Sequence, residues 1–146
     1  MKIARRYLTI VVVIIIFFIM ILFFTALNSS KRNFKISQKH VKDITLINNL
    51  SGTVKTISIK QDINSICELF NSTSMDIIKD WNGHYERDGG NSYTFIFNLS
   101  TGLDIEFSYY DGSYLLNNGN AYHINSTKFE DFWNLNYEEK KISHIN

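Results

Sequence analysis

Two carboxylates on one predicted strand have the spacing in this sequence that best fits a catalytic site. Asp104 and Glu106 stand two positions apart, so they would share one face of a strand, and Asp111 follows soon after. Two carboxyl groups whose pKa values are pushed apart can act as general acid and general base. A solvated strand face carries the same pattern without any catalytic role, and nothing else in the sequence indicates a sugar-binding cleft. We therefore expect no catalytic residue and no enzymatic activity.

The histidines and the cysteine form no motif for a metal or a nucleophile. His40, His84, His123 and His144 are scattered, and no two of them stand at the i, i+4 spacing of a helical metal site. Phosphate-loop, nucleophile-elbow and zinc-protease motifs are absent from the sequence. Cys67 lies on the apolar stripe of a predicted helix, which indicates a small buried side chain rather than a catalytic thiolate. The sequence predicts neither a metal site nor a cofactor.

A stretch rich in aromatic and charged residues is the strongest candidate for binding. Residues 74–91 read SMDIIKDWNGHYERDGGN, and long loops of this kind often carry function. Trp81, His84, Tyr85 and Arg87 lie in this stretch, and tryptophan, tyrosine and arginine are the residue types enriched in binding hot spots. The alternative is a plain connection in which Trp81 covers the edge of the core and the remainder is solvated. We take these four residues as the predicted binding site.

An apolar run near the N-terminus predicts a transmembrane helix over residues 7–28. Tyr7 to Leu27 is 21 residues without a charge. At about 1.5 Å per residue such a helix spans about 31 Å, close to the hydrocarbon thickness of about 30 Å. The alternative is a core helix of a soluble protein, but a domain of this size could not surround a helix that is apolar on every side.

The same run has to be distinguished from a cleaved signal peptide. Lys2, Arg5 and Arg6 precede it, as in a signal peptide, but the run exceeds the usual ~7–15 residues of the apolar region. If Ala26 were the last residue before a cut, Phe24 would occupy a position that requires a small residue. The sequence has no cysteine directly after the run, which excludes a lipoprotein anchor. We expect an uncleaved signal-anchor, with cleavage as the alternative.

The orientation of this anchor depends on two competing signals. Residues 1–6 carry three basic residues and residues 29–42 carry five, and this count alone favours a domain in the cytoplasm. The usual signal-anchor pathway instead keeps a short basic tail inside and exports the chain beyond the span. We expect a cytoplasmic tail over residues 1–6 and a C-terminal domain outside the cell membrane. Residues 29–42 are predicted as a basic linker, either solvated or held against anionic lipid headgroups.

Charge is distributed unevenly along the 146 residues. Residues 1–42 carry eight basic residues and no acid, whereas residues 43–146 carry seven of the 15 basic residues and all 14 acids, a net charge of −7. An acidic domain argues against a nucleic-acid partner, because that affinity comes from lysine and arginine against phosphates. A single cysteine excludes an internal disulfide.

The soluble domain predicted over residues 43–137 has the order strand, strand, helix, four-strand meander, helix. Apolar residues recur with a period of two in the strands and of 3.6 in the helices. A two-layer α+β fold, an antiparallel sheet with two helices on one face, fits this alternation. A frayed tail is expected over residues 138–146. The predicted elements are strands at 44–47 and 54–59, a helix at 62–71, four strands within 92–124 and a helix that starts at residue 127.

Turn and capping residues set the expected boundaries. Two dipeptides favour tight hairpins, because a type I′ turn needs a positive φ at both central positions. Asp62 is placed as the N-cap of the first helix. Thr127 and Glu130 fit a capping box at the start of the second helix. The two hairpin dipeptides are Asp111-Gly112 and Asn118-Gly119.

The order of these elements resembles a small uncharacterised membrane-anchored extracytoplasmic domain family of Gram-positive bacteria. The apolar run, the helix at 62–71, the meander and a closing helix with Phe129 and Trp133 carry the resemblance, which covers most of the chain by pattern. Such proteins are typically lipoproteins or single-pass anchored. Because a lipid-attachment cysteine is missing here, the resemblance implies a single-pass anchor. It implies location and fold, and it transfers no catalytic residue.

Together these features predict a single-pass extracytoplasmic binding module that is not an enzyme. Its expected partners are the lipid bilayer, through residues 7–28, and an envelope protein or peptide. The alternative is a protective or inhibitory factor, similar to an immunity protein, that intercepts a toxin or hydrolase at the cell surface. That alternative rests on fold analogy alone.

Overall fold

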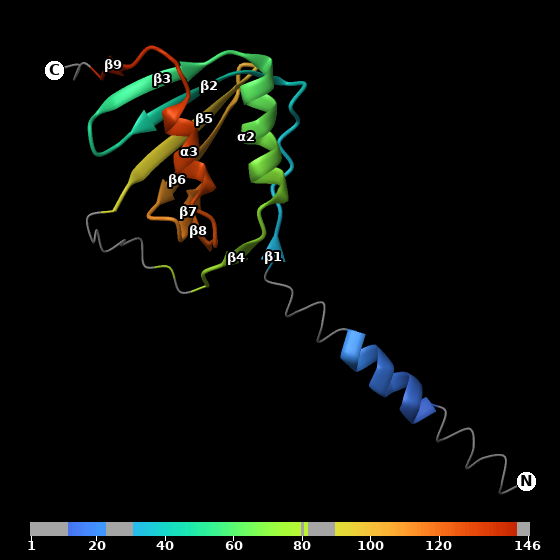
Figure 1. The fold of residues 1–146 in the computed structure, drawn as a ribbon. Coiled ribbons are helices and arrows are strands. Elements are labelled where there is room, and N and C mark those ends of the chain that lie inside the picture. Colours follow the sequence, from blue (N-terminus) through green and yellow to red (C-terminus); the bar gives the residue numbers. More distant parts are fainter. Residues whose placement is uncertain (1–11, 23–30, 80, 82–89, 143–146) are drawn as a thin grey trace, which may run out of the picture. The chain divides into compact units, whose positions relative to one another are not determined.

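The computed structural model describes residues 12–22, 31–79, 81 and 90–142 (Figure 1). The chain divides into two units, residues 1–30 and residues 31–146. Residues 12–22 are helical, and within the described ranges no helix has both the length and the apolar character needed to cross a membrane. The predicted span over residues 7–28 lies partly outside the described residues and stays a prediction.

Residues 31–142 form an α+β domain with one antiparallel sheet, which confirms the predicted class. The described residues contribute nine strands in the order β1-β4-β8-β7-β6-β5-β2-β3-β9. The predicted four-strand meander is present as β5 to β8, each strand paired with the next. The strands are β1 Lys31–Arg32, β2 Val41–Asn48, β3 Thr53–Ile57, β4 Met75–Ile77, β5 Ser92–Leu99, β6 Asp104–Tyr110, β7 Tyr114–Asn117, β8 Asn120–His123 and β9 Lys140–Lys141.

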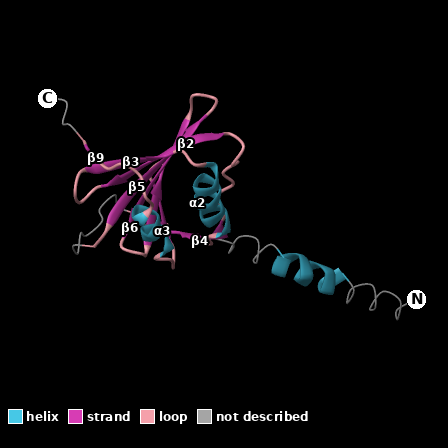
Figure 2. Ribbon diagram, turned by 45° about the horizontal axis from the view of Figure 1, so that its top comes forward, coloured by secondary structure: helices cyan, strands magenta, loops and turns pink. Residues whose placement is uncertain are grey.

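Two helical segments cover one face of this sheet, as predicted. They are α2, Lys60–Ser72, and α3, Lys128–Asp131, which continues into the short 3₁₀ helix η1, Phe132–Asn134 (Figures 1 and 2). Phe70 of α2 is fully buried between sheet and α3. Its ring centroid lies 4.8 to 5.3 Å from those of four other phenylalanines, which makes it the centre of the core. The four partners are Phe95, Phe97, Phe107 and Phe129.

Both predicted hairpin turns have the backbone geometry that their residues favour. All four central positions have positive φ, between 47° and 75°. Asparagine, aspartate and glycine tolerate this region at the lowest cost, which is why the two dipeptides fix the register of the meander. The four positions are Asp111, Gly112, Asn118 and Gly119.

The predicted N-cap at Asp62 is wrong. Helix α2 begins at Lys60 after Ile59, which makes no side-chain capping hydrogen bond. The Asp62 carboxylate instead accepts a hydrogen bond of 2.6 Å from the hydroxyl of Tyr137, near the other end of the domain sequence. The Asp62 side chain, which the local pattern assigns to the N-cap, therefore forms a tertiary hydrogen bond with Tyr137 instead.

The predicted capping box at Thr127 and Glu130 is also wrong. Thr127 makes no side-chain capping bond, and only its backbone carbonyl accepts from the Glu130 N–H, at 3.0 Å. The Glu130 carboxylate accepts from the buried hydroxyl of Tyr109 at 2.9 Å and from the Asn91 amide at 3.0 Å. Burial, and then this hydrogen bond, raise the pKa of Tyr109. A buried phenol hydroxyl needs a hydrogen-bond partner. Here it donates to the Glu130 carboxylate, which therefore does not cap the helix.

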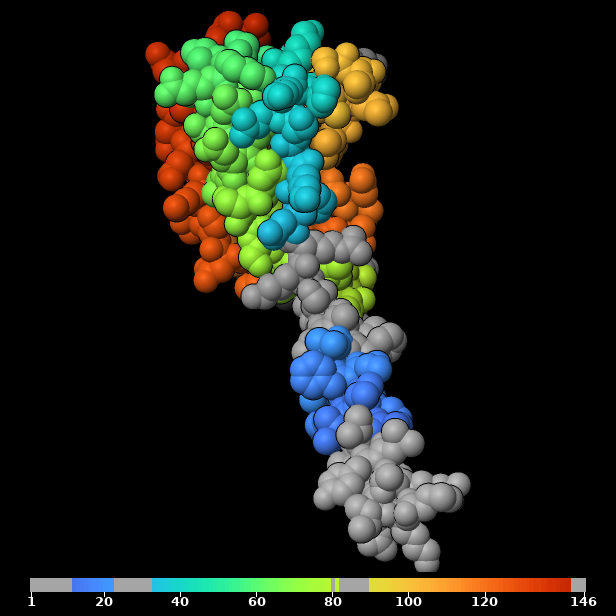
Figure 3. All heavy atoms as spheres, turned by 90° about the vertical axis from the view of Figure 1, so that its right-hand side faces the viewer, coloured from blue at the N-terminus to red at the C-terminus, as the bar shows by residue number. Residues whose placement is uncertain are grey.

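Residues 31–42, which the sequence predicts as most of a basic linker, pack as part of the domain. Ile36 and Val41 are each only 4% exposed, and the Phe34 ring lies 4.7 Å from that of Phe107. Asn71 of α2 donates to the carbonyl of Ile36 at 2.9 Å and accepts from its N–H at 2.7 Å. Figure 3 shows this segment (cyan) running alongside α2 (green). The asparagine amide thus replaces the strand partner that an extended segment would otherwise need.

Three short strands lie where the sequence predicts irregular structure, and one of them, β1, lies in the predicted basic linker 29–42 and pairs with β4. Strand β4 lies in the stretch 74–91 and pairs with β8, and β9 lies in the predicted tail 138–146 and pairs with β3. Strands β1 and β9 form the two edges of the sheet, and each of the three has only two or three residues, too few to leave an alternating pattern in the sequence.

Candidate functional site

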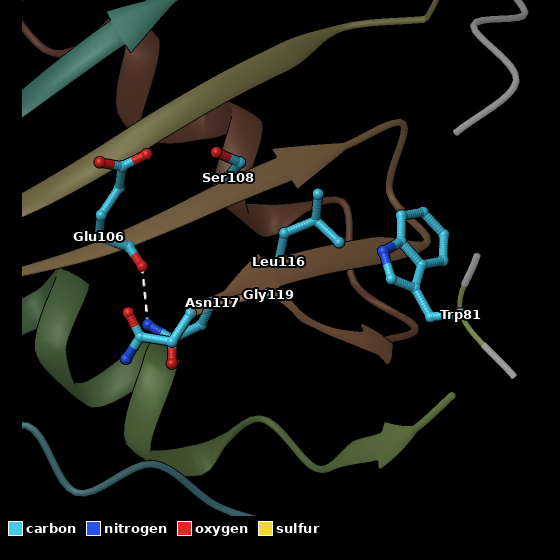
Figure 4. Close-up of a pocket in the computed structure, with 7 residues that line it drawn as sticks. Trp81, Glu106, Ser108, Leu116, Asn117 and Gly119 are labelled. Carbon is cyan, nitrogen blue, oxygen red and sulfur yellow. Dashed lines mark hydrogen bonds between the residues drawn. The ribbon is translucent and has the colours of Figure 1, made fainter. Parts of the chain in front are cut away.

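A pocket of about 310 Å³ lies on the open face of the sheet, the face opposite the helices. Strand alternation places it there: Phe107 and Leu115 point into the core, so Glu106, Ser108 and Leu116 point to the open face. We call it the Trp81 pocket (Figure 4). Its lining residues are Trp81, Glu106, Ser108, Leu116, Asn117, Asn118 and Gly119.

The floor of the Trp81 pocket is made by the end of the β6–β7 ladder. Ser108 pairs with Leu116 across the two strands, and this is the last paired position before β7 turns. The Asn117 amide then donates to the backbone carbonyl of Glu106 at 2.7 Å, which closes the ladder with a side chain. Asn118 and Gly119, the type I′ turn between β7 and β8, form one rim. The floor is therefore fixed by hydrogen bonds and turn geometry.

The two ends of the Trp81 pocket differ in chemistry. Figure 4 shows the indole of Trp81 at one end, directed toward Leu116, and Glu106 at the other end, with Ser108 between them. In the described part of the chain, no ion pair or hydrogen bond involves the Glu106 carboxylate. An aromatic face and an unpaired carboxylate together can bind a ligand by stacking and by charge.

A polar network next to the pocket holds the open face in place. The Asn49 amide donates to the hydroxyls of Ser92 at 2.9 Å and Thr94 at 3.0 Å. The hydroxyls of Thr94 and Ser108 share a hydrogen bond of 3.3 Å, which links this network to the pocket lining. Polar groups that are already paired lose little freedom when a ligand arrives, so the surface is preorganised.

No family model, curated protein or solved structure matches this chain. The proposed contact surface therefore depends on the geometry of the open face.

Of the four predicted binding residues, only Trp81 lies among the described residues, and it lines the pocket. His84, Tyr85 and Arg87 lie outside the described residues, so their part in the site stays a prediction. The sequence did not predict the lining from β7 and the turn after it. The Asn118-Gly119 signal placed a hairpin there, but nothing local indicated that Trp81 would stand over it.

The carboxylates of β6 are arranged as a strand face. Asp104 and Glu106 both lie on the open face of β6, while Asp111 sits in the next turn. Within the described ranges, no three histidine, cysteine, aspartate or glutamate side chains come together as a metal site would require.

Cys67 is buried on α2, and we expect its thiol to be unreactive in the folded chain. Burial raises the pKa of the thiol to about 11, although the positive charge of Lys60 lowers it slightly. At pH 8, a thiol reagent should label the folded chain far more slowly than the chain in denaturant. The side chain is fully buried, and rapid labelling of the native chain would show this placement to be wrong.

The same pKa shift gives a pH dependence of stability. The unfolded thiol, with a pKa of 9.0, deprotonates before the folded one at about 11. Between these values the folded state binds more protons, so the free energy of unfolding falls as pH rises from 9 to 11. Urea titrations of the wild type and of Cys67→Ala across this window measure it, and the decline should be smaller in the variant.

Proposed function

We propose that this protein is a single-pass membrane-anchored extracytoplasmic binding module, not an enzyme, whose contact surface is the open face around the Trp81 pocket. The observation that carries the binding proposal is the pocket itself, with an indole at one end and a carboxylate at the other. The proposed partner is an envelope protein or peptide. The resemblance to anchored domains of Gram-positive bacteria agrees with this proposal.

The apolar helix supports the membrane anchor. In residues 12–22 every side chain is valine, isoleucine, leucine, phenylalanine or methionine, and their exposed fractions run from 46% to 65%. Water is an unfavourable solvent for such a surface, at about 25 cal/mol per Å² of apolar area. We propose that residues 7–28 cross the bilayer, with residues 1–6 in the cytoplasm and the domain outside.

Fractionation and a topology reporter test the anchor. The full chain should be recovered with membranes, and alkaline phosphatase fused after Asn146 should be active. The variant Ile16→Lys should reduce membrane recovery, since a lysine at the centre of a span costs about 2.5–3.5 kcal/mol, while Ile16→Leu should not. Recovery in the aqueous fraction would contradict the anchor, and activity of a reporter that works only in the cytoplasm would contradict the orientation.

Partner recovery from membranes tests the binding surface. Cross-linking with the full chain should capture a partner, and Trp81→Ala should lower its recovery by about tenfold or more, as for a hot-spot residue. Leu50→Ala is the matched control, because Leu50 is 73% exposed in the turn between β2 and β3. Equal recovery with both variants would remove the Trp81 pocket from the binding surface. A captured toxin or hydrolase that loses activity on binding would favour the protective factor.

A further inference from the structure

We infer that the Trp81 pocket binds the positively charged side chain of a lysine or arginine carried by a partner protein or peptide. This inference rests on the proposed binding function and names the chemistry of its ligand. Three observations on the described residues support it: the sign of the charges on the open face, the two ends of the pocket, and a lysine that the same domain already holds in a similar way.

Strands β2 to β8 present carboxylates on the open face and almost no opposing cations, while four basic residues of the sheet lie in its edge strands β1 and β9. Strands β2 to β8 contain two lysines. Lys55 points to the core, and Lys42 lies at the bulge of β2, 4.0 Å from the carboxylate of Asp43. The described lining of the pocket includes an acidic residue and no basic one, and such a surface attracts cations and repels anions. The open-face carboxylates of these strands are Asp43, Asp76, Asp104 and Glu106.

The two ends of the pocket suit the parts of a basic side chain. A lysine ammonium or an arginine guanidinium only donates hydrogen bonds, and the pocket offers acceptors in the Glu106 carboxylate and the Ser108 hydroxyl. The face of the Trp81 indole attracts a cation within about 6 Å of its centre. The side chain of Leu116 can cover the methylene groups of the ligand. The volume of about 310 Å³ is at the lower end of small-ligand pockets, which suits one long side chain.

On the other side of the sheet, the domain already holds a cation by these means. The Lys55 ammonium lies 4.8 Å from the centre of the Trp133 ring. It donates to the backbone carbonyls of Trp133 at 2.7 Å and Leu135 at 3.2 Å. An indole face and oxygen acceptors therefore suffice here to hold an ammonium with almost no contact to water. The Trp81 pocket adds a full negative charge to the same combination.

Peptide binding to the full chain in detergent micelles tests the inference. The probe is a fluorescently labelled decapeptide in which glycine and lysine alternate, and a decapeptide of glycine and serine is the neutral control. We expect saturable binding of the lysine peptide only, weaker at high salt because the charges are screened. Glu106→Gln should raise the Kd about tenfold or more, as expected for loss of a charged hydrogen bond. Asp131→Asn, an exposed carboxylate on α3, is the matched control and should leave the Kd unchanged.

Other results would overturn either the inference or the proposed function, and the two can be told apart. No binding of the lysine peptide, equal binding of the neutral peptide, or an unchanged Kd in Glu106→Gln would reject a cation site in this pocket. Free spermine that binds more tightly than the peptide would reject a protein side chain as the source of the charge. Partner recovery that depends on Trp81 but not on Glu106 would leave the proposed function intact and reject the cation. Peptide binding that needs Glu106, without any partner whose recovery depends on Trp81, would leave the cation site intact and reject the proposed function.

Discussion

Replacing Phe70 with alanine is expected to lower the free energy of unfolding by about 3–5 kcal/mol, the usual cost of removing a buried phenylalanine. The ring is fully buried on α2 and contacts Phe95 and Phe107 of the sheet and Phe129 of α3. Its loss would leave a cavity where both helices meet the sheet. Because neighbouring rings pack edge to face around it, few of them can move into the space.

Urea unfolding of the full chain in detergent, followed by tryptophan fluorescence, measures this loss. Trp133 is a suitable probe because its ring lies 5.7 Å from that of Tyr93 and senses the packing of η1 on the sheet. Phe70→Leu should lose less than Phe70→Ala, since it fills part of the volume. Leu50→Ala, at an exposed turn, should stay within about 0.5 kcal/mol of the wild type. A Phe70→Ala variant as stable as Leu50→Ala would show that the core is not centred on this ring.

The parts of the fold that local chemistry decides were predictable from the sequence. Alternation placed Phe95, Phe97 and Phe107 on one side of the meander, and all three are fully buried. Positive φ is tolerated best by asparagine, aspartate and glycine. The dipeptides that end at Gly112 and Gly119 therefore predict the positions of both turns. The apolar stripe of α2 with Cys67 on it was likewise visible, because a helix repeats every 3.6 residues.

Contacts between distant residues decided what the sequence could not predict. The buried segment around Ile36 reads as polar and basic, and it belongs to the domain because the Asn71 side chain satisfies its backbone. The local sequence favours Asp62 as a helix N-cap, but in the fold its carboxylate accepts a hydrogen bond from Tyr137. At the candidate site, alternation aimed Glu106 at the open face. Which loop residue stands over that face depends on the path of the chain after β4, and no periodicity encodes that path.

Replacing Lys55 with methionine is expected to destabilise the domain by about 1–3 kcal/mol, the cost of leaving a polar group in the interior without its partner. Lys55 is 9% exposed and stands on the core side of β3. Two effects oppose each other. Removing a buried charge saves its desolvation cost, and methionine preserves most of the packing of the stem. Against this, the carbonyl of Trp133 loses its donor at the end of η1, where a helix cannot satisfy its own last carbonyls, whereas the carbonyl of Leu135 still accepts from the backbone N–H of Tyr137.

We expect the Trp133 carbonyl to decide the balance, because Lys55 is held by neutral acceptors rather than by a carboxylate. Its removal leaves the half-buried Trp133 carbonyl without a donor, and a carbonyl cannot take up a proton as a paired carboxylate could. Urea unfolding of Lys55→Met beside Lys128→Met, an exposed lysine on α3, measures the difference, and only the first should lose stability. The fluorescence of Trp133 should also change in Lys55→Met, since an ammonium no longer lies 4.8 Å from its ring. A variant that is more stable than the wild type would mean that desolvation outweighs the two hydrogen bonds. Such a result would also mean that the Trp81 indole contributes less to cation binding in the Trp81 pocket than the Lys55–Trp133 contact suggests.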